Sequence, residues 1–366
     1  MRISSLWFRF DWVMLLVACA LVSVGLVVMY GIGISRPEAD LFLFQKQLVG
    51  AAIGLVCLGA MAIFDYRQLR GLSFAVYAVG ALLLIGVLFF GETVRGTRGW
   101  YSIGGLSFQP VEVAKVCFVV SLASYLSRFT HRALPWHVIL GSLAGAMGYA
   151  ALVMLQPDFG SAMVILALWG AVTLFVGIGW RSLLVMVGTG LVVGTLLWTS
   201  LLQPYQRDRL LAFIDPSRDP RGAGYNVTQA QIAIGSGGLF GKGIGEGSQA
   251  RLRFLPEAST DFTFAVVGEE LGFTGITFVL GLFGLLFFRL YVGARDAEDD
   301  FAVLLAVGIG ALFLVHLLIN AGMNLGIMPV TGIPFPFLSS ASSFLLAMML
   351  SLGIAESIAL RKRSVG

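Results

Sequence analysis

Residues 251–264 read Arg-Leu-Arg-Phe-Leu-Pro-Glu-Ala-Ser-Thr-Asp-Phe-Thr-Phe, and the apolar run that follows carries Glu269 and Glu270. The stretch places an acid, Asp261, where a long polar segment meets an apolar segment long enough to cross a membrane. A carboxylate at such a boundary either caps the helix, whose dipole favours an anion at its N-terminus, or takes part in a reaction. The stretch alone is compatible with both roles.

The composition indicates a chain that is solvated by lipid. Of the 366 residues, 58% are apolar and 12% are charged, and the mean hydropathy is +0.90, whereas a soluble globular protein is about 45–50% apolar and about 25% charged. Cys19, Cys57 and Cys117 fall in apolar runs, which is typical of buried small hydrophobes and not of a disulfide or zinc framework. The net charge of +4 predicts no nucleic-acid partner, because basic residues in a membrane chain mainly mark one side of the membrane.

Ten segments are apolar and long enough, at about 20 residues, to cross a bilayer as helices. They are 11–33, 46–64, 71–90, 110–127, 137–155, 160–178, 182–202, 262–288, 301–325 and 338–360. We therefore expect an all-α polytopic membrane protein with ten transmembrane helices in a single domain over residues 1–366. The first segment is too long for the apolar part of a signal peptide and no clear cleavage site follows it, so we expect an uncleaved first helix.

Arginine and lysine gather in alternate loops, and these residues favour the cytoplasmic side. With a cytoplasmic N-terminus, the inside segments hold Arg2, Arg9, Arg67, Arg70, Arg128, Arg132, Arg181, Arg289, Arg295, Arg361, Lys362 and Arg363. The short outside loops hold only Arg36, Lys46, Arg95 and Arg98. This bias predicts that both termini are cytoplasmic and that a large extracytoplasmic loop, about residues 203–261, joins helices 7 and 8.

The long loop carries charges of both signs. Its basic residues are Arg207, Arg209, Arg218, Arg221, Lys242, Arg251 and Arg253, and its acids are Asp208, Asp215, Asp219, Glu246, Glu257 and Asp261. The loop is either solvated and charge-balanced, or a place where some arginines meet an anionic ligand such as a phosphate at the outer membrane surface.

Seven glycines occur among residues 235–247 of this loop. Their spacing does not match a nucleotide-binding P-loop, because Ser236 stands where its first glycine belongs and Gly243 follows Lys242 in place of serine or threonine. We expect the glycines to serve backbone flexibility or a close approach of the chain to a ligand.

Two charged residues, Glu112 and Lys115, fall inside the fourth segment and share one helical face. They form either a structural ion pair that makes burial tolerable or an electrostatic element that lines a cavity. In the expected topology Lys115, Asp158, Asp261 and residues 329–343 all lie near the outer leaflet. Because these residues converge there, we expect a functional site at the outer end of the bundle.

On the ninth segment, His316, Asn320 and Asn324 repeat every four residues, and we expect them to form hydrogen bonds to other helices. Glu269 and Glu270 lie about 12–14 Å along the eighth segment from Asp261, at about 1.5 Å per residue, so we expect them to pack or to line a cavity but not to act with Asp261 directly. No two histidines have the spacing of metal ligands, and no metal site is predicted. The residues alone leave Asp261 open between a helix cap and a general base.

Several motifs follow one another in order along the chain. They are Arg98-Gly-Trp100, Gln109-Pro-Val-Glu112-Val-Ala-Lys115, Gln156-Pro-Asp158-Phe-Gly, Asp219-Pro-Arg-Gly-Ala-Gly-Tyr-Asn, Ile234-Gly-Ser-Gly-Gly-Leu, Phe254-Leu-Pro-Glu257-Ala-Ser-Thr-Asp261-Phe and Pro329-Val-Thr-Gly-Ile-Pro. Together they resemble the SEDS family of bacterial membrane proteins (shape, elongation, division and sporulation), its RodA branch more than its FtsW branch.

The resemblance implies a peptidoglycan glycosyltransferase that polymerises lipid II at the outer face of the bacterial plasma (inner) membrane during cell elongation and rod-shape maintenance. The family's aspartate maps onto Asp261, which would act as the general base on the acceptor sugar hydroxyl. That hydroxyl would attack the anomeric carbon of the donor and invert it as undecaprenyl pyrophosphate leaves. The substrate-binding candidates are Lys115, Glu112, Trp100, Arg98, Glu257, Asp158, Arg207 and Arg209.

The leaving pyrophosphate needs cationic stabilisation where negative charge develops. Lys115 is the first candidate, followed by Arg98, Arg207 and Arg209. We expect no cofactor and leave open a divalent cation such as Mg²⁺ on the pyrophosphate.

The chain departs from the family pattern at two places. Ser259 stands where the family usually has a histidine before its Thr-Asp-Phe, and the usual Tyr-Gly-Gly-Ser-Ser reads Ser340-Ala-Ser-Ser343. Both departures leave Asp261 intact but put in doubt a role for that histidine or those glycines.

The family also implies a partner, a class B penicillin-binding protein that crosslinks the new glycan. Two alternatives remain for the chain itself, a lipid II flippase and a non-catalytic scaffold of the elongation complex. Either would use the same charged residues without chemistry.

Overall fold

Apolar segments of this length form helices because a bilayer offers no partner for backbone N–H and C=O groups, which must therefore be satisfied within the segment. The computed structural model of the chain describes residues 9–35, 39–94, 96–103, 106–130, 133–196, 199, 204–215, 219, 222–252 and 254–361. Arg218, Arg221 and Arg253 of the predicted loop lie outside these residues.

Each of the ten predicted spans coincides with one helix. These are α2 (Trp12–Ile34), α3 (Phe42–Ile63), α5 (Ser73–Phe90), α6 (Pro110–Leu126), α7 (Trp136–Met154), α8 (Phe159–Val176), α9 (Trp180–Leu196), α13 (Thr263–Arg295), α14 (Asp300–Asn324) and α15 (Ser342–Leu360). Within the described part of the chain, eight of them are long and apolar enough to cross a membrane, and α6 and α9 are shorter at 17 residues each. The chain is therefore a multi-pass membrane protein, and the count of ten spans stays a prediction.

Three predicted boundaries are wrong, among them the end of α13, which runs to Arg295 and not to residue 288. Helix α3 begins at Phe42, so Lys46 lies within its second turn and not in the preceding loop. Helix α15 begins at Ser342, four residues later than expected, because residues 338–341 form a non-helical turn. A short helix, α4 (Tyr66–Gly71), also separates α3 from α5.

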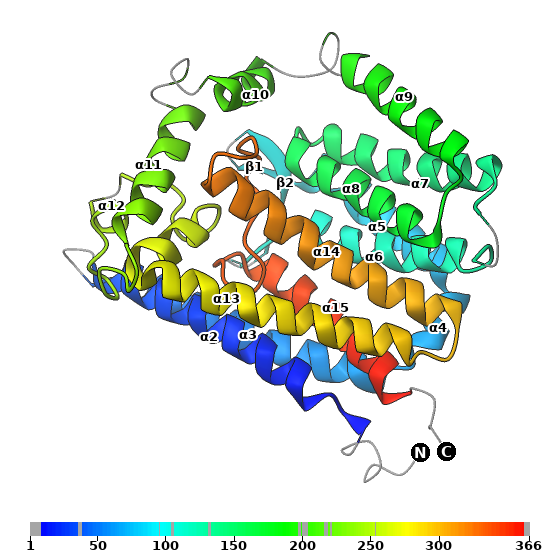
Figure 1. The fold of residues 1–366 in the computed structure, drawn as a ribbon, viewed down its shortest axis with the longest axis horizontal. Helices are drawn as coiled ribbons and strands as arrows, with labels where there is room; N and C mark the ends of the chain where they lie inside the picture. The colour runs from blue at the N-terminus through cyan, green and yellow to red at the C-terminus, as the bar shows by residue number, and fades with distance from the viewer. Residues whose placement is uncertain are drawn as a thin grey trace.

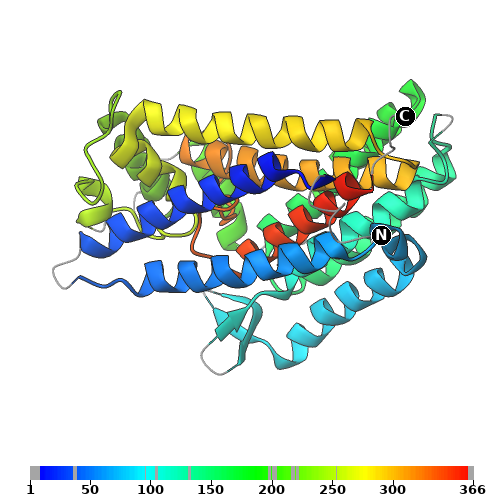
Figure 2. The same ribbon diagram turned by 90° about the horizontal axis from the view of Figure 1, so that it is seen from below.

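A small sheet, which we did not predict, fills the segment between α5 and α6. Strands β1 (Glu92–Val94), β2 (Thr97–Ile103) and β3 (Leu106–Phe108) pair antiparallel in that order and stand out from the helices beside α5 (Figure 2). The Tyr101 hydroxyl donates to the carbonyl of Leu83 and so ties the sheet to α5, and burial there raises the pKa of Tyr101. Aromatic and β-branched residues in β2 were the available signal for a strand.

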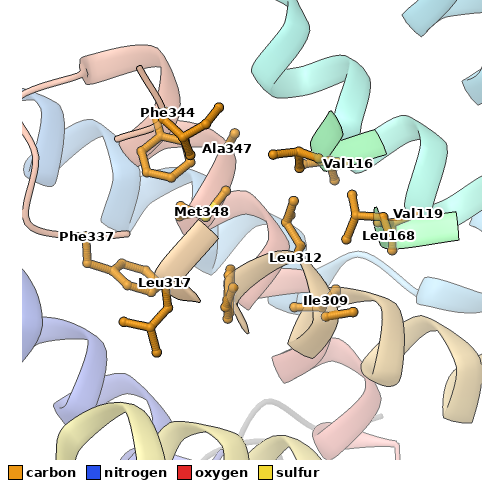
Figure 3. Close-up of a cluster of buried hydrophobic side chains, with 14 of the residues drawn as sticks. Val116, Val119, Leu168, Ile309, Leu312, Leu317, Phe337, Phe344, Ala347 and Met348 are labelled. Atoms are coloured by element: carbon orange, nitrogen blue, oxygen red, sulfur yellow. The ribbon is translucent and has the colours of Figure 1, made fainter. Parts of the chain in front are cut away.

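The helices pack around α15. In an 18-residue stretch of α15, 89% of the residues are buried, against 17% for α5, so α15 is central and α5 peripheral. A helix that is apolar on all sides suits such a position. Figure 3 shows part of this core, where side chains from four helices meet, among them Val116 of α6, Leu168 of α8, Leu312 of α14 and Phe344 of α15.

Both ends of the described chain lie at one end of the bundle (Figure 1). The N–H of Asp11, which precedes α2, donates to Glu356 of α15 at 2.6 Å, and Arg289 of α13 forms an ion pair with Asp11 at 2.6 Å. The predicted long loop is partly helical and contains α10 (Pro204–Ile214), α11 (Ala223–Ser236) and α12 (Ser248–Arg251), of which α11 and α12 lie at the other end of the bundle (Figure 1).

Helix α13 is broken at Gly272, whose backbone is not helical (φ 68°, ψ −163°). The glycine-rich stretch 235–247 packs into this break, where the N–H groups of Lys242 and Gly243 donate to the carbonyls of Glu269 and Glu270 at 2.9 and 3.0 Å. On the other side of the break, the N–H of Phe273 donates to Gly238 at 2.9 Å. The glycines thus allow a close approach of two chain segments, a role that differs from the expected backbone flexibility or approach to a ligand.

Candidate active site

A cavity of about 410 Å³ opens at the end of the bundle that carries the small sheet. Its walls come from the first turns of α3, from β1 and β2, from the start of α8, from α10 and from two non-helical segments, 257–261 and 329–341. The predicted site residues that line it are Trp100, Asp158, Arg209, Glu257 and Asp261. Four segments that are far apart in the sequence thus bring predicted site residues into one cavity.

Asp261 lies in a tight turn that is built on Glu257. The carbonyl oxygen of Glu257 accepts from the N–H groups of Thr260, Asp261 and Phe262 at 3.0–3.2 Å. Glu257 itself has φ 56°, a left-handed conformation that costs a non-glycine residue free energy and persists only where the surroundings hold it. Its carboxylate accepts from the Thr260 hydroxyl at 3.1 Å.

Three successive carbonyls of this turn are held by side chains from other parts of the fold. Asn320 and Asn324 of α14 donate to the carbonyl of Asp261 at 2.8 and 3.1 Å. The Ser339 hydroxyl donates to the carbonyl of Thr260, and Ser340 donates to that of Ser259 through both its N–H and its hydroxyl. The predicted hydrogen bond to another helix is confirmed for Asn324, whose Oδ1 accepts from the N–H of Ala265 on α13, whereas Asn320 bonds to carbonyls of two non-helical segments.

His316, the third member of this face, is also hydrogen-bonded to another helix. Its Nε2 lies 2.9 Å from Nζ of Lys115, and its Nδ1 lies 2.8 Å from the carbonyl of Leu312 on its own helix. Because the Leu312 carbonyl can only accept, Nδ1 carries the proton and Nε2 accepts from Lys115.

Asp261 does not occupy the N-cap position of α13. The N-cap position of α13 is Phe262, and no side chain at that position accepts a hydrogen bond from the first turn. Asp158, in contrast, caps α8, because its Oδ1 accepts from the N–H of Ser161 at 2.9 Å. The difference is local, because the N–H groups of residues 260–262 bond to the carbonyl of Glu257 in a turn that precedes α13.

Two cations line the cavity in the described part of the chain, Lys46 and Arg209. Arg209, on α10, was among the predicted site residues, whereas Lys46, on α3, was not. Among the described residues, no carboxylate lies within ion-pair distance of Lys46. The signal was present in the sequence, because a lysine one turn inside an apolar helix is rarely placed there without a partner or a function.

Lys115 and Glu112 do not line this cavity. They form a buried ion pair at 2.8 Å, with 0% and 2% of their side chains exposed, and Lys115 Nζ also contacts His316. The structure favours the first of the two interpretations, a structural ion pair on α6. A contact of Lys115 with substrate stays a prediction and would require the lysine to leave both partners.

Arg98 and Arg207, two further predicted site residues, do not line the cavity around Asp261 either. The guanidinium of Arg98 donates to the carbonyls of Gly91 and Phe89 at 3.1 and 3.0 Å, where the end of α5 offers unpaired carbonyls. Arg207 donates to the carbonyl of Thr199 at 3.4 Å. Their roles in substrate binding stay predictions.

The glutamates of α13 serve packing, as expected. Glu269 accepts from Lys242 Nζ at 2.9 Å and from the N–H of Gln249, and Glu270 accepts from the N–H of Gly245. Neither lines the cavity around Asp261. Within the described residues, no group of three His, Cys, Asp or Glu side chains could hold a metal ion.

The two departures from the family pattern lie next to each other. Ser259 and Ser340 both line the cavity, and the two hydrogen bonds from Ser340 to the carbonyl of Ser259 join their segments. This wall of the cavity is therefore built from short side chains, Ser259, Ser340, Ala341 and Ser342.

Known proteins share this arrangement over nearly the whole chain. Residues 11–364 match the family model of FtsW, RodA and SpoVE, described as cell cycle proteins. The chain is 37% identical to peptidoglycan glycosyltransferase MrdB of Escherichia coli, over 95% of this chain and 93% of that protein. It is 31% identical to peptidoglycan glycosyltransferase RodA of Treponema pallidum, over 96% and 98%.

Solved structures agree with the sequence relatives. The crystal structure of the Thermus thermophilus rod shape determining protein RodA superimposes with a TM-score of 0.72 at 30% identity, covering 98% of this chain and 99% of that one. A chain from a structure on the coordination of polymerization and crosslinking by a peptidoglycan synthase complex superimposes with a TM-score of 0.80 at 33% identity, covering 96% and 97%.

Proposed function

Because the chain belongs to the FtsW, RodA and SpoVE family, it is a peptidoglycan glycosyltransferase with a role in cell elongation, and we propose that it polymerises lipid II in the cavity around Asp261. The observation that carries this proposal is that one cavity holds an acid, Asp261, together with two cations, Lys46 and Arg209. Transfer of a sugar from a pyrophosphate-linked donor needs a base for the acceptor hydroxyl and positive charge for the leaving group.

In the proposed mechanism, Asp261 takes the proton of the acceptor sugar hydroxyl as the hydroxyl oxygen attacks the anomeric carbon of the donor. The new C–O bond forms as the bond from that carbon to the pyrophosphate breaks, so a single displacement inverts the carbon. The electron pair of the broken bond leaves with the lipid-linked pyrophosphate, whose developing charge Lys46 and Arg209 stabilise. Lys46 thus takes the place that we first gave to Lys115.

The other walls suit a sugar substrate. Trp100 offers an aromatic face, and Asp158 and Glu257 offer acceptors for sugar hydroxyls. The hydroxyl of Thr331, also in the wall, is buried and has no hydrogen-bond partner, so a substrate group would satisfy it. We assign these residues to substrate binding.

We propose that Lys115 and Glu112 support the site from behind and do not contact substrate. Their ion pair and the contact with His316 join α6 to α14, and α14 carries Asn320 and Asn324, which hold the Asp261 turn. His316 and Asn320 lie one turn apart on α14, so the helix itself connects the Lys115 contact to the asparagines that hold the turn.

We propose no organic cofactor for the reaction. A divalent cation such as Mg²⁺ would arrive with the pyrophosphate, because the described residues offer no preformed group of three acidic or imidazole ligands for it.

In the cell, we propose that the chain crosses the bacterial plasma membrane ten times as one domain, with both termini cytoplasmic and the cavity at the outer face. The excess of arginine and lysine in the inside segments supports this orientation. The partner would be a class B penicillin-binding protein, since the chain is similar to a component of a complex that couples polymerization with crosslinking.

The test is the polymerisation of lipid II by the purified full-length chain. We expect the wild type to make glycan polymer, and Asp261→Asn to lower the rate by at least about 100-fold, the usual weight of a general base. The matched control is Asp296→Asn, which removes a carboxylate that pairs with Arg295 at the far end of α13 and should leave the rate unchanged.

Polymer made by Asp261→Asn at the wild-type rate would show that Asp261 is not the base. Movement of lipid II across liposome membranes without any polymer would instead favour a flippase. Neither polymer nor movement, from a folded chain that binds its transpeptidase, would favour a scaffold.

A further inference from the structure

A second cavity, of about 390 Å³, lies between the first turns of α5 and α7 and the last turns of α6. Helix α6 starts beside the cavity around Asp261, so its last turns lie at the opposite end of the bundle. Phe74 stands at the rim of the second cavity with 84% of its surface exposed. In a multi-pass membrane protein such an exposed aromatic side chain faces lipid, so the cavity opens sideways to the bilayer.

The wall of this cavity is apolar even though several hydroxyls belong to it. The Ser121 hydroxyl donates to the carbonyls of Ser73 and Cys117, and that of Ser124 donates to Ser73 Oγ. The Tyr77 hydroxyl donates to the carbonyl of Gly145. Because these groups are already paired within the protein, the cavity offers its occupant mainly hydrocarbon surface.

Two glycines of α7 keep the cavity open. A Cβ atom at Gly141 would lie 2.5 Å from the Tyr125 hydroxyl, and a Cβ at Gly145 would lie 4.0 Å from the ring of Tyr77. With no side chain at either position, the space between α7 and α5 stays empty of protein. Its volume lies within the range of about 300–1,000 Å³ that is usual for ligand sites.

One arginine lines the mouth of this cavity, and the backbone of a second lies beside it. Arg128 belongs to the lining and is exposed, and Arg70 lies next to it, because its carbonyl accepts from the hydroxyl of Ser124. Within the described residues, neither guanidinium has a carboxylate within ion-pair distance. Two unpaired cations beside an apolar cavity complement a molecule that has an anionic head and a hydrocarbon tail.

We propose that this cavity binds an anionic phospholipid, with one acyl chain between α5 and α7 and the phosphate held by Arg70 and Arg128. A membrane lipid can enter from the side, past Phe74, without crossing the protein. The site is separate from the cavity around Asp261, and it does not depend on the reaction assigned there.

The test is a lipid titration of the purified full-length chain in detergent, read by native mass spectrometry. Phosphatidylglycerol and phosphatidylcholine with the same acyl chains serve as probes. We expect the wild type to retain one phosphatidylglycerol in preference to phosphatidylcholine. The double variant Arg70→Gln and Arg128→Gln should lose this preference, by about fivefold for each arginine, the usual weight of one basic residue beside anionic lipid. Gly145→Leu should reduce the retention of both lipids because its side chain fills the cavity.

Matched controls are available for both changes. Arg295→Gln removes an exposed arginine that is paired with Asp296, and Gly170→Leu adds the same side chain on α8 where a Cβ meets no atom within 4 Å. Both should bind lipid like the wild type. If Gly145→Leu does not fold, Gly145→Ala, whose Cβ fits, still narrows the cavity and should weaken retention by a smaller factor.

Unchanged retention by the Gly145 variants, or an unchanged preference in the double arginine variant, would overturn the proposal. Crosslinking of Gly145→Cys to the membrane helix of a co-expressed transpeptidase would overturn it in favour of a protein occupant.

Discussion

Asn320 and Asn324 act on the candidate base through its backbone. Both donate to the carbonyl of Asp261, and Asn320 also donates to the carbonyl of Ile333 at 2.7 Å, so one side chain joins the two non-helical segments that line the cavity. Each of these asparagines is 0% exposed. A position set by buried hydrogen bonds is more restricted than one set by a mobile loop, which suits a general base.

We expect Asn320→Leu to lower the rate of lipid II polymerisation with little change in KM, because Asp261 shifts while the binding walls remain. It should also lower the free energy of unfolding by about 1–3 kcal/mol, since the buried carbonyl of Ile333 loses its donor. Steady-state kinetics and thermal unfolding in detergent would measure the two effects.

Ser351→Ala is the control for Asn320→Leu. Its hydroxyl is equally buried but donates only to Ala347 on its own helix, so both kcat and KM should stay at wild-type values. A higher KM with unchanged kcat in Asn320→Leu would contradict a positioning role.

Among the elements, α13 depends on the glycine-rich stretch. Its break at Gly272 leaves N–H and C=O groups without helical partners, and the backbone of residues 238–243 supplies them. The contact needs glycine, because a Cβ at Gly237 would lie 1.9 Å from the carbonyl oxygen of Gly268 and one at Gly241 would lie 2.1 Å from that of Glu270. The burial of α13 also changes near this break. Residues 262–270, before the break, are all buried, and the residues that follow include partly exposed ones.

We expect Gly237→Ala to lower the free energy of unfolding by about 1–3 kcal/mol, the usual cost of overpacking. Gly235→Ala is the matched control, because its Cβ would meet no atom within 4 Å and the residue lies inside α11. In that position alanine should raise stability by about 0.5–1 kcal/mol. Thermal unfolding of the two variants should therefore shift in opposite directions, and equal shifts would contradict the packing argument.

For the whole molecule, the arrangement of the bundle decides where the cavity lies relative to the membrane. The described chain starts and ends at one end of the bundle, while the glycine-rich stretch lies at the other end with α11 and α12 (Figure 1). If the termini are cytoplasmic, as the charge bias predicts, the cavity around Asp261 opens to the outer face.

Cysteine labelling in cells can test this orientation. In a chain with Cys19, Cys57 and Cys117 replaced by alanine, we expect a membrane-impermeant maleimide to label Glu246→Cys in cells with a permeabilised outer membrane. Gln68→Cys, on α4, should react only after the plasma membrane is opened. Both positions are exposed and polar, so the maleimide should reach either cysteine equally well once it is on the same side of the membrane. Labelling of Gln68→Cys in place of Glu246→Cys before the plasma membrane is opened would show that the topology is inverted.

The helical part of the fold could be predicted because a bilayer requires long apolar segments, and every predicted span coincides with a helix. The small sheet and the break in α13 were missed because each depends on a partner segment. β2 needs β1 and β3, and the break at Gly272 is stable only where residues 238–243 satisfy its backbone. Periodicity along one segment does not report such partners.

The sequence by itself determined that this protein lies in a membrane, that arginine and lysine gather in alternate loops, and that Asp261 stands at a loop–helix boundary. Hydropathy and charge carry this information because lipid penalises polar groups wherever the chain folds. Only the tertiary structure decided that Asp261 shares its cavity with Lys46 and Arg209, and that Lys115 is paired with Glu112 and His316. These groups come from helices far apart in the chain, and which of them meet is settled by packing alone.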